Sequence, residues 1–261
     1  MKHIFTILII LFSCVLWAGT LTITTFDHDG DGSASGIGAD IFVDENSPNN
    51  PGGSDAIKVR TNTVAQHIQV TYMRFDLSFV NDLNVTDAKL KLYDYRFDES
   101  PAQNRQYSIY GMTNSSLDNW GETAISWNNA PGITDDGIAF NGVDFNSDAL
   151  HLGTFTFINS DQAGFSTDIS LSGLANFINN DDNRFVTLMM AHVEDGRDTL
   201  FYFGSKESNH YSRTSSTTVA IGSLAPQLIL QGEDVRFIPE PVSLIFLILG
   251  ILLYFSKNKY K

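Results

Sequence analysis

The sequence predicts an all-β protein, a β-sandwich of jelly-roll type with one short helix. Many short segments alternate between apolar and polar residues, and turn-rich stretches separate them. Asn, Asp, Ser, Thr and aromatic residues are plentiful, whereas lysine is scarce. Once the apolar ends are set aside, about 220 residues remain, the size of one large β domain or two small ones. We therefore predict a single sandwich over residues 20–235, without internal repeats.

One strand is predicted most clearly over residues 67–77, where Ile68, Val70, Tyr72 and Arg74 share a face. Similar patterns predict further strands at 21–26, 56–61, 88–92, 106–112, 152–158, 185–192, 199–203, 217–221 and 227–231. Turns fall between them at 46–55, 128–132 and 135–144, which are rich in Gly, Pro, Asn and Asp.

One helix is predicted near residue 175. Leu171, Leu174, Ala175 and Ile178 recur at i, i+3, i+4 and i+7, the spacing of an amphipathic helix. The asparagines at 179–180 then end it.

The N-terminus has the layout of a secretory signal peptide over residues 1–19. Lys2 precedes an apolar run, and the small residues Ala18 and Gly19 follow it. Cys14 lies inside this run and is the only cysteine of the chain. The exported domain is therefore expected to fold without a disulfide.

The C-terminal segment, residues 237–261, has three parts. Pro239, Glu240 and Pro241 form a stiff elbow that cannot join the following helix. An apolar helix is expected over 242–255, because only helical backbone is satisfied in lipid. The basic end consists of Lys257, Lys259 and Lys261. The run is shorter than the roughly 20 residues of a stable span, so it predicts either a temporary membrane contact or a short single-pass anchor.

These three parts, in this order, resemble the PEP-CTERM sorting signal of Gram-negative bacteria. The resemblance implies that an exosortase reads the elbow and releases the protein or transfers it to the cell surface. The expected route is export through the inner membrane and anchoring before processing. The expected location is the cell surface or extracellular matrix of a Gram-negative-type bacterium.

The charge of the chain excludes one class of partner. Acidic residues outnumber basic ones by 30 to 16, and the net charge is −14. Such a chain repels the phosphate backbone, so nucleic-acid binding is not expected. The same charge favours solubility outside the cell and the binding of cations.

A calcium loop is a candidate over residues 27–40. Alternate carboxylates in a tight loop can converge on one Ca²⁺, and Gly32 permits the sharp turn. The candidate ligands are Asp27, Asp29, Asp31 and Asp40. An EF-hand would need Glu at its twelfth position, where this chain has Gly38. The alternatives are a looser Ca²⁺ loop and a solvated acidic turn.

The stretch WGETAISWNNAP at 120–131 is the most distinctive internal segment. Two tryptophans beside polar groups could stack on the apolar faces of sugar rings. The candidate glycan-binding residues are Trp120, Trp127, Glu122 and Asn128. The alternative is that this turn plugs one end of the sandwich, with its polar groups bonded to backbone.

Several segments occur in an order that resembles DNRLRE-type domains over residues 39–231. They are IFVDENSPNNPGGSDAIKVR at 41–60, YMRFDLS at 72–78, DAKLKLY at 87–93, WGETAISWNNAP at 120–131, TDIS at 167–170, SKE at 205–207 and APQLIL at 225–230. The resemblance implies a jelly-roll β-sandwich. It also implies non-catalytic glycan binding, because some members are carbohydrate-binding modules attached to polysaccharide-degrading enzymes.

Catalysis is the alternative function. The six histidines lack metal-ligand spacing, and no nucleophile elbow is present. A secreted polysaccharide lyase or hydrolase could still use paired carboxylates, with Glu122, Glu194 and Glu207 as candidates. We expect instead a surface-sorted, non-catalytic sandwich that binds polysaccharide or serves as an extracellular matrix component.

Overall fold

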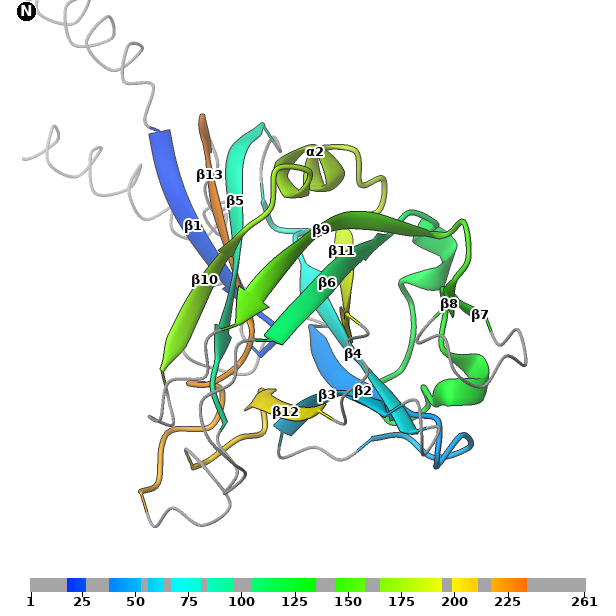
Figure 1. Ribbon diagram of the computed structural model, residues 1–261. Helices are drawn as coiled ribbons and strands as arrows, with labels where there is room; N and C mark the ends of the chain where they lie inside the picture. The colour runs from blue at the N-terminus through cyan, green and yellow to red at the C-terminus, as the bar shows by residue number, and fades with distance from the viewer. Residues whose placement is uncertain are drawn as a thin grey trace, which may run out of the picture.

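Two antiparallel sheets pack face to face in the computed structural model of the chain (Figure 1). One has four strands in the order β1–β13–β5–β10. The larger sheet has seven, in the order β12–β3–β4–β11–β6–β9 with β2 paired to β4. The structure describes residues 18–26, 38–52, 56–62, 67–80, 84–95, 105–134, 144–157, 165–193, 199–210 and 217–233. The predicted β-sandwich with one short helix is confirmed within these residues.

The four-stranded sheet comprises β1 (Ala18–Thr24), β13 (Gln227–Glu233), β5 (Val85–Tyr93) and β10 (Ser166–Ser170). The larger sheet comprises β2 (Ala39–Asp44), β3 (Ala56–Asn62), β4 (His67–Asp76), β6 (Arg105–Met112), β9 (Ala149–Phe157), β11 (Phe185–His192) and β12 (Thr199–Gly204). A small hairpin pairs β7 (Ile133–Thr134) with β8 (Asp144–Phe145), and two 3₁₀ turns are η1 (Ser115–Leu117) and η2 (Trp127–Asn129).

The strands follow the alternation of the sequence closely, and β11 has the predicted bounds. One predicted strand, at 217–221, is wrong. Residues 217–220 are irregular apart from a single bridge between Thr218 and His210, and a turn begins at Ile221. The reason is local: Gly222 has a φ of 84°, and the backbone hydrogen bonds Ser223 N to Ala220 O and Ala225 N to Gly222 O close tight turns.

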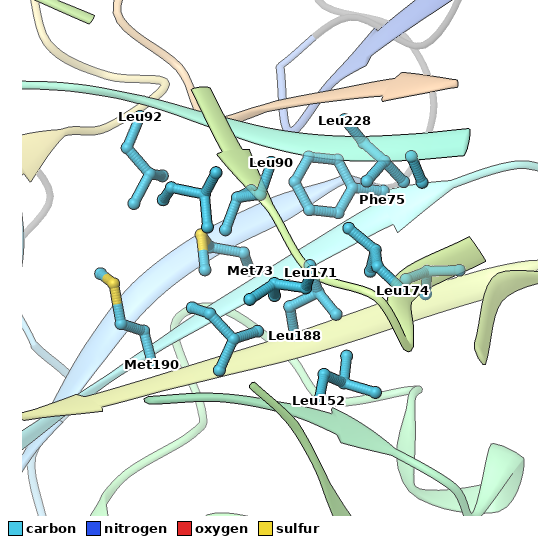
Figure 2. Close-up of a cluster of buried hydrophobic side chains, with 14 of the residues drawn as sticks. Met73, Phe75, Leu90, Leu92, Leu152, Leu171, Leu174, Leu188, Met190 and Leu228 are labelled. Atoms are coloured by element: carbon cyan, nitrogen blue, oxygen red, sulfur yellow. The ribbon is translucent and has the colours of Figure 1, made fainter. Parts of the chain in front are cut away.

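The main core lies between the two sheets. On β5, Leu90 and Leu92 point inward and are fully buried, whereas Lys89 and Lys91 lie on the other face. They meet apolar residues of β4 and β11 across the interface, including Met73 (Figure 2). Each such buried side chain contributes roughly 1.5–3 kcal/mol, so this apolar layer stabilises a chain whose single cysteine permits no internal disulfide.

A second apolar layer covers the outer face of the larger sheet. Val43, Val70 and Met189 point away from the main core, yet they are fully buried. The chain between β6 and β9 folds over them and contributes Trp120 and Ile125 to the same cluster. This covering explains why nine of the ten residues of β4 are buried instead of alternating with solvent.

The helix α2 (Leu174–Asn179) closes one end of the sandwich (Figure 1). It buries Leu174, Phe177 and Ile178, and Leu171 is buried just before it. The Asn179 side chain ties the helix to β5, because it accepts from Val85 N at 2.9 Å and donates to Val85 O at 2.8 Å. The predicted helix is confirmed.

Several predictions concern residues outside the described ranges. The first 17 residues of the signal peptide, the loop residues Asp27, Asp29 and Asp31, and the whole segment 237–261 belong to this group. These predictions stay open. In the described part of the chain, no helix has the length and apolar character needed to cross a membrane.

Candidate functional site

Three carboxylates from distant parts of the sequence meet at one edge of the larger sheet. Asp40 lies on β2, Glu122 follows the Trp120 turn, and Glu207 lies in the turn after β12. One ligand oxygen of each lies within 4.8 Å of the others. We call these three residues the acidic cluster.

Lys206 supplies the counter-charge of this cluster. Its Nζ lies 2.7 Å from Glu122 Oε2 and 3.8 Å from Glu207 Oε1, and it donates to Gly38 O at 3.1 Å. The same residue also donates its backbone N–H to Asp40, at 3.1 Å to Oδ2. One lysine therefore contacts all three carboxylates.

Asp40 is the most deeply buried member of the cluster, with 2% of its surface exposed. Burial, followed by the nearby charge of Glu207, raises the pKa of Asp40 from 3.8 to about 8. Thr25 Oγ1 donates to Asp40 Oδ2, and Asp40 N donates to Glu122 Oε1 at 3.1 Å. Burial also raises the pKa of Glu207, to about 7, with the charge of Glu122 as the next cause.

The acidic cluster could hold a metal ion such as Ca²⁺, because carboxylate oxygens are the ligands that hard cations prefer. It combines Asp40, a predicted calcium ligand, with two glutamates that the sequence suggested for other roles. An ion pair involving Lys206 and Glu207 was expected from the sequence, but the contacts of Lys206 with Glu122 and Asp40 were not. The cavity beside the cluster is small, about 140 Å³.

Trp120 lies in the second apolar layer with 7% of its surface exposed. Its Nε1 donates to Thr187 Oγ1 at 3.1 Å, and the edge of Tyr72 contacts it at a centroid distance of 5.9 Å. The Arg74 guanidinium carbon lies 4.9 Å from the centre of its ring. Arg74 also donates to Asp118 O and Trp120 O, so it fixes the turn that carries the indole. Trp120 is thus buried and hydrogen-bonded, but it covers the outer face of the larger sheet and not an end of the sandwich.

The other aromatic candidate, Trp127, is half-buried in η2 and packs against the same layer. Its neighbour Asn128 is exposed and bonds to the loop after β2. The Asn128 N–H donates to Pro48 O at 3.0 Å, and Nδ2 donates to Asn49 Oδ1 at 2.8 Å. The predicted glycan residues thus lie in two places: Glu122 in the acidic cluster, and the others around the covering segment.

A larger cavity, of about 340 Å³, lies beside α2, where the ends of β6 and β9 meet the helix. We call it the α2 cavity. Its walls combine apolar and polar side chains from three parts of the chain: Met112, Thr113, Ser115, Leu150, His151, Leu152, Gly173, Asn176, Phe177, Asn180, Asp181 and Asp182. These residues could not be grouped from the sequence, because no short motif joins them.

Some polar groups of the α2 cavity already serve the fold. Thr113 Oγ1 donates to Asp148 O at 3.1 Å, and Asn180 Nδ2 donates to Asn176 O at 2.9 Å. By contrast, the side chains of Asn176, Asp182 and Ser115 make no hydrogen bond to another described residue. Among the described residues that line the cavity, none is lysine or arginine.

Comparison with known proteins assigns the family. Residues 34–171, more than half of the chain, match the family described as carbohydrate-binding module family 96. This range holds β2 to β10, together with Asp40 and Glu122, and ends before α2 and Glu207. No curated protein matches the chain. The chain therefore belongs to carbohydrate-binding module family 96, a non-catalytic family, and this membership is consistent with glycan binding.

Proposed function

We propose that this protein is exported, sorted to the cell surface and binds polysaccharide there without cleaving it. The observation that carries the proposal is the family match over residues 34–171, which includes five of the seven strands of the larger sheet and two of the four strands of the smaller one. The α2 cavity supports it, since its volume lies within the range of small-molecule sites, roughly 300–1,000 Å³.

Titration of the full-length chain against a panel of soluble polysaccharides tests the binding. We expect saturable binding to at least one member of the panel and no release of reducing ends. A matrix defect on gene deletion, without measurable affinity for any glycan, would favour a purely structural matrix protein instead.

The sorting half of the proposal rests on the C-terminal segment. The resemblance of Pro239, Glu240 and Pro241 to the PEP-CTERM elbow supports recognition by an exosortase, and the DNRLRE-like order of motifs agrees with an exported glycan-binding domain. Mass spectrometry of the mature surface protein tests it. A tail that persists through Lys261 would indicate a simple anchor.

A lyase or hydrolase is the second candidate, and one observation favours it. The pKa of Glu207 is raised to about 7, a value suited to a general acid, and Glu122 lies nearby. However, Lys206 neutralises this pair, and the adjacent cavity of about 140 Å³ is smaller than a typical ligand site. Glycan turnover that Glu207→Gln abolishes would support this candidate.

A further inference from the structure

We propose that the side chains of Lys206 and Glu122 become joined by an isopeptide bond that forms without an enzyme. They make the closest ion pair of the acidic cluster, with Lys206 Nζ 2.7 Å from Glu122 Oε2. The product is an amide between Lys206 Nζ and Glu122 Cδ. It ties the turn after β12 to the chain that covers the outer face of the larger sheet. This modification is independent of the proposed glycan binding.

The groups already present balance the reaction. Lys206 Nζ attacks Glu122 Cδ, so that a C–N bond forms and the bond from Cδ to Oε2 breaks. The ammonium gives up two protons, and Oε2 leaves with them as one water molecule. An ammonium and a carboxylate thus become an amide and water, and no oxidant, reductant or other co-reactant is needed.

The surroundings of this pair differ from those of an ordinary surface ion pair, in which water solvates both charges and the side chains stay mobile. Only 18% of the Lys206 side chain and 24% of the Glu122 side chain are exposed. Nζ also donates to Gly38 O at 3.1 Å, and the backbone N–H of Lys206 donates to Asp40 Oδ2 at 3.1 Å. The amine is therefore held in place, and it has only to move from Oε2 to the adjacent carbon. Such positioning of two reacting groups lowers the barrier of their reaction.

The second carboxylate oxygen of Glu122 has a hydrogen-bond donor in place. The backbone N–H of Asp40 donates to Glu122 Oε1 at 3.1 Å. Negative charge collects on this oxygen when Nζ attacks the carbon, and a fixed N–H at about 2.7–3.1 Å stabilises such a charge. Asp40 lies on β2 and is buried, so the sheet holds the donor in position.

Glu207 can carry a proton between the reacting groups. Its Oε1 lies 3.8 Å from Lys206 Nζ, so a small movement or one bridging water lets it accept a proton from the nitrogen. One of its oxygens also lies within 4.8 Å of a carboxylate oxygen of Glu122, to which the proton must go. The geometry thus makes Lys206 the nucleophile, the Asp40 N–H the donor to the developing charge, and Glu207 the proton carrier.

The bond would give a cross-link to a chain whose single cysteine permits no internal disulfide. It closes a long loop between the covering chain and the turn after β12. A covalent link across such a loop restricts the unfolded chain and so favours the folded state.

Peptide mapping of the full-length chain by mass spectrometry tests the proposal. The folded protein is incubated for increasing times, then unfolded and digested with trypsin. We expect a branched peptide that joins the stretches around Glu122 and Lys206 and is lighter than its two parts by one water molecule. This peptide should come to dominate over the two unlinked ones, and trypsin should not cut after Lys206 within it. Chain kept in urea throughout should form none, because the bond depends on the fold.

Three variants and one control separate the roles. Lys206→Arg keeps the positive charge, but its guanidinium stays protonated and does not attack, so the branched peptide should be absent. Glu122→Gln should form the same bond with loss of ammonia, and its branched peptide should have the mass of the wild-type one. Glu207→Gln should slow the appearance of the peptide at least about tenfold. Lys89→Arg, on the outer face of β5, should leave the rate unchanged.

Absence of the branched peptide from folded wild-type protein after days of incubation would overturn the inference. A loss of water that persists in Lys206→Arg would also overturn it, because the water would then come from another site, such as one of the Asp–Gly pairs of the chain. Either result leaves the proposed function untouched, since titration against polysaccharides tests that separately.

Discussion

The ammonium of Lys206 lies 2.7 Å from a carboxylate oxygen of Glu122, and this contact joins the turn after β12 to the segment that covers the larger sheet. Because Lys206 also donates its backbone N–H to Asp40 on β2, one residue holds three elements together. Without this lysine, the carboxylates of the acidic cluster would repel one another.

Replacing Lys206 by methionine should lower the free energy of unfolding by about 2 kcal/mol. The substitution leaves Glu122 and Glu207 close together without a counter-charge. Both carboxylates are half-buried, so the loss should lie between that of an exposed ion pair and that of a buried one. Urea unfolding measures the loss. The control is Lys89→Met on the outer face of β5, which should change stability by less than about 0.5 kcal/mol. Equal losses for the two variants would contradict the role of the cluster.

Calcium should stabilise the Lys206→Met variant more than the wild type. In the wild type the ammonium contacts the same oxygens that a cation would bind, so its removal frees Glu122 and Glu207 for Ca²⁺. Melting temperatures with calcium and with a chelator measure the difference. Adding Asp40→Asn should reduce the calcium effect. Calcium shifts that are the same in all three proteins would argue against a metal-binding cluster.

Replacing Trp120 by phenylalanine should lower stability by about 1–2 kcal/mol and leave glycan affinity unchanged. The variant loses the hydrogen bond to Thr187, whose hydroxyl is then buried without this partner. Chemical unfolding and glycan titration are both needed, since a stacking role would produce a loss of affinity at normal stability.

Gly111 should not tolerate a side chain. A Cβ at this position would lie 2.5 Å from the ring of Phe177, which is itself buried and lines the α2 cavity. Gly111→Ala should therefore lower the free energy of unfolding by about 1–3 kcal/mol and weaken the binding of any ligand in the α2 cavity. Gly121→Ala is the matched control, because its nearest neighbour would be Ala124 Cβ at 3.4 Å. Retention of full stability by Gly111→Ala would contradict the packing described.

The ionisation of Asp118 should contribute to the pH dependence of the protein's stability. Burial raises the pKa of this carboxyl from 3.8 to about 7. A group that holds its proton more tightly in the folded state destabilises the fold as pH rises from 3.8 to 7. Asp118→Asn removes this pH-dependent loss. The free energy of unfolding of the variant, relative to that of the wild type, should therefore increase as the pH rises from 3.8 to 7. Unfolding midpoints at pH 4 to 8 measure it, and parallel curves would contradict the assignment.

The local parts of the fold were predictable from sequence. Alternation in 185–192 gave β11 its bounds, and the spacing of Leu174 and Ile178 gave α2, because both signals lie within a few neighbouring residues. The burial of both faces of β4 was not predictable, since it depends on a segment that returns across the sheet some forty or more positions later. The residue pattern within β4 does not indicate that both of its faces are covered.

The same limit applies to the sites. Asp40 was a candidate ligand from a local aspartate pattern, but its partners Glu122 and Glu207 lie in turns that only the tertiary fold brings beside it. The α2 cavity was missed for a related reason. Its walls come from three stretches that carry no shared motif, and the free amide of Asn176 differs from that of Asn179 only in what surrounds it.

The position of β13 has a consequence for the order of folding. This last strand lies between β1 and β5, so the first strand has no neighbour in its sheet until residues 227–233 arrive. Contacts between such distant parts of a chain form slowly, because a long loop must close before they contribute. The smaller sheet can therefore be completed only after nearly the whole chain has been delivered, and up to that moment β1 keeps an unpaired backbone edge.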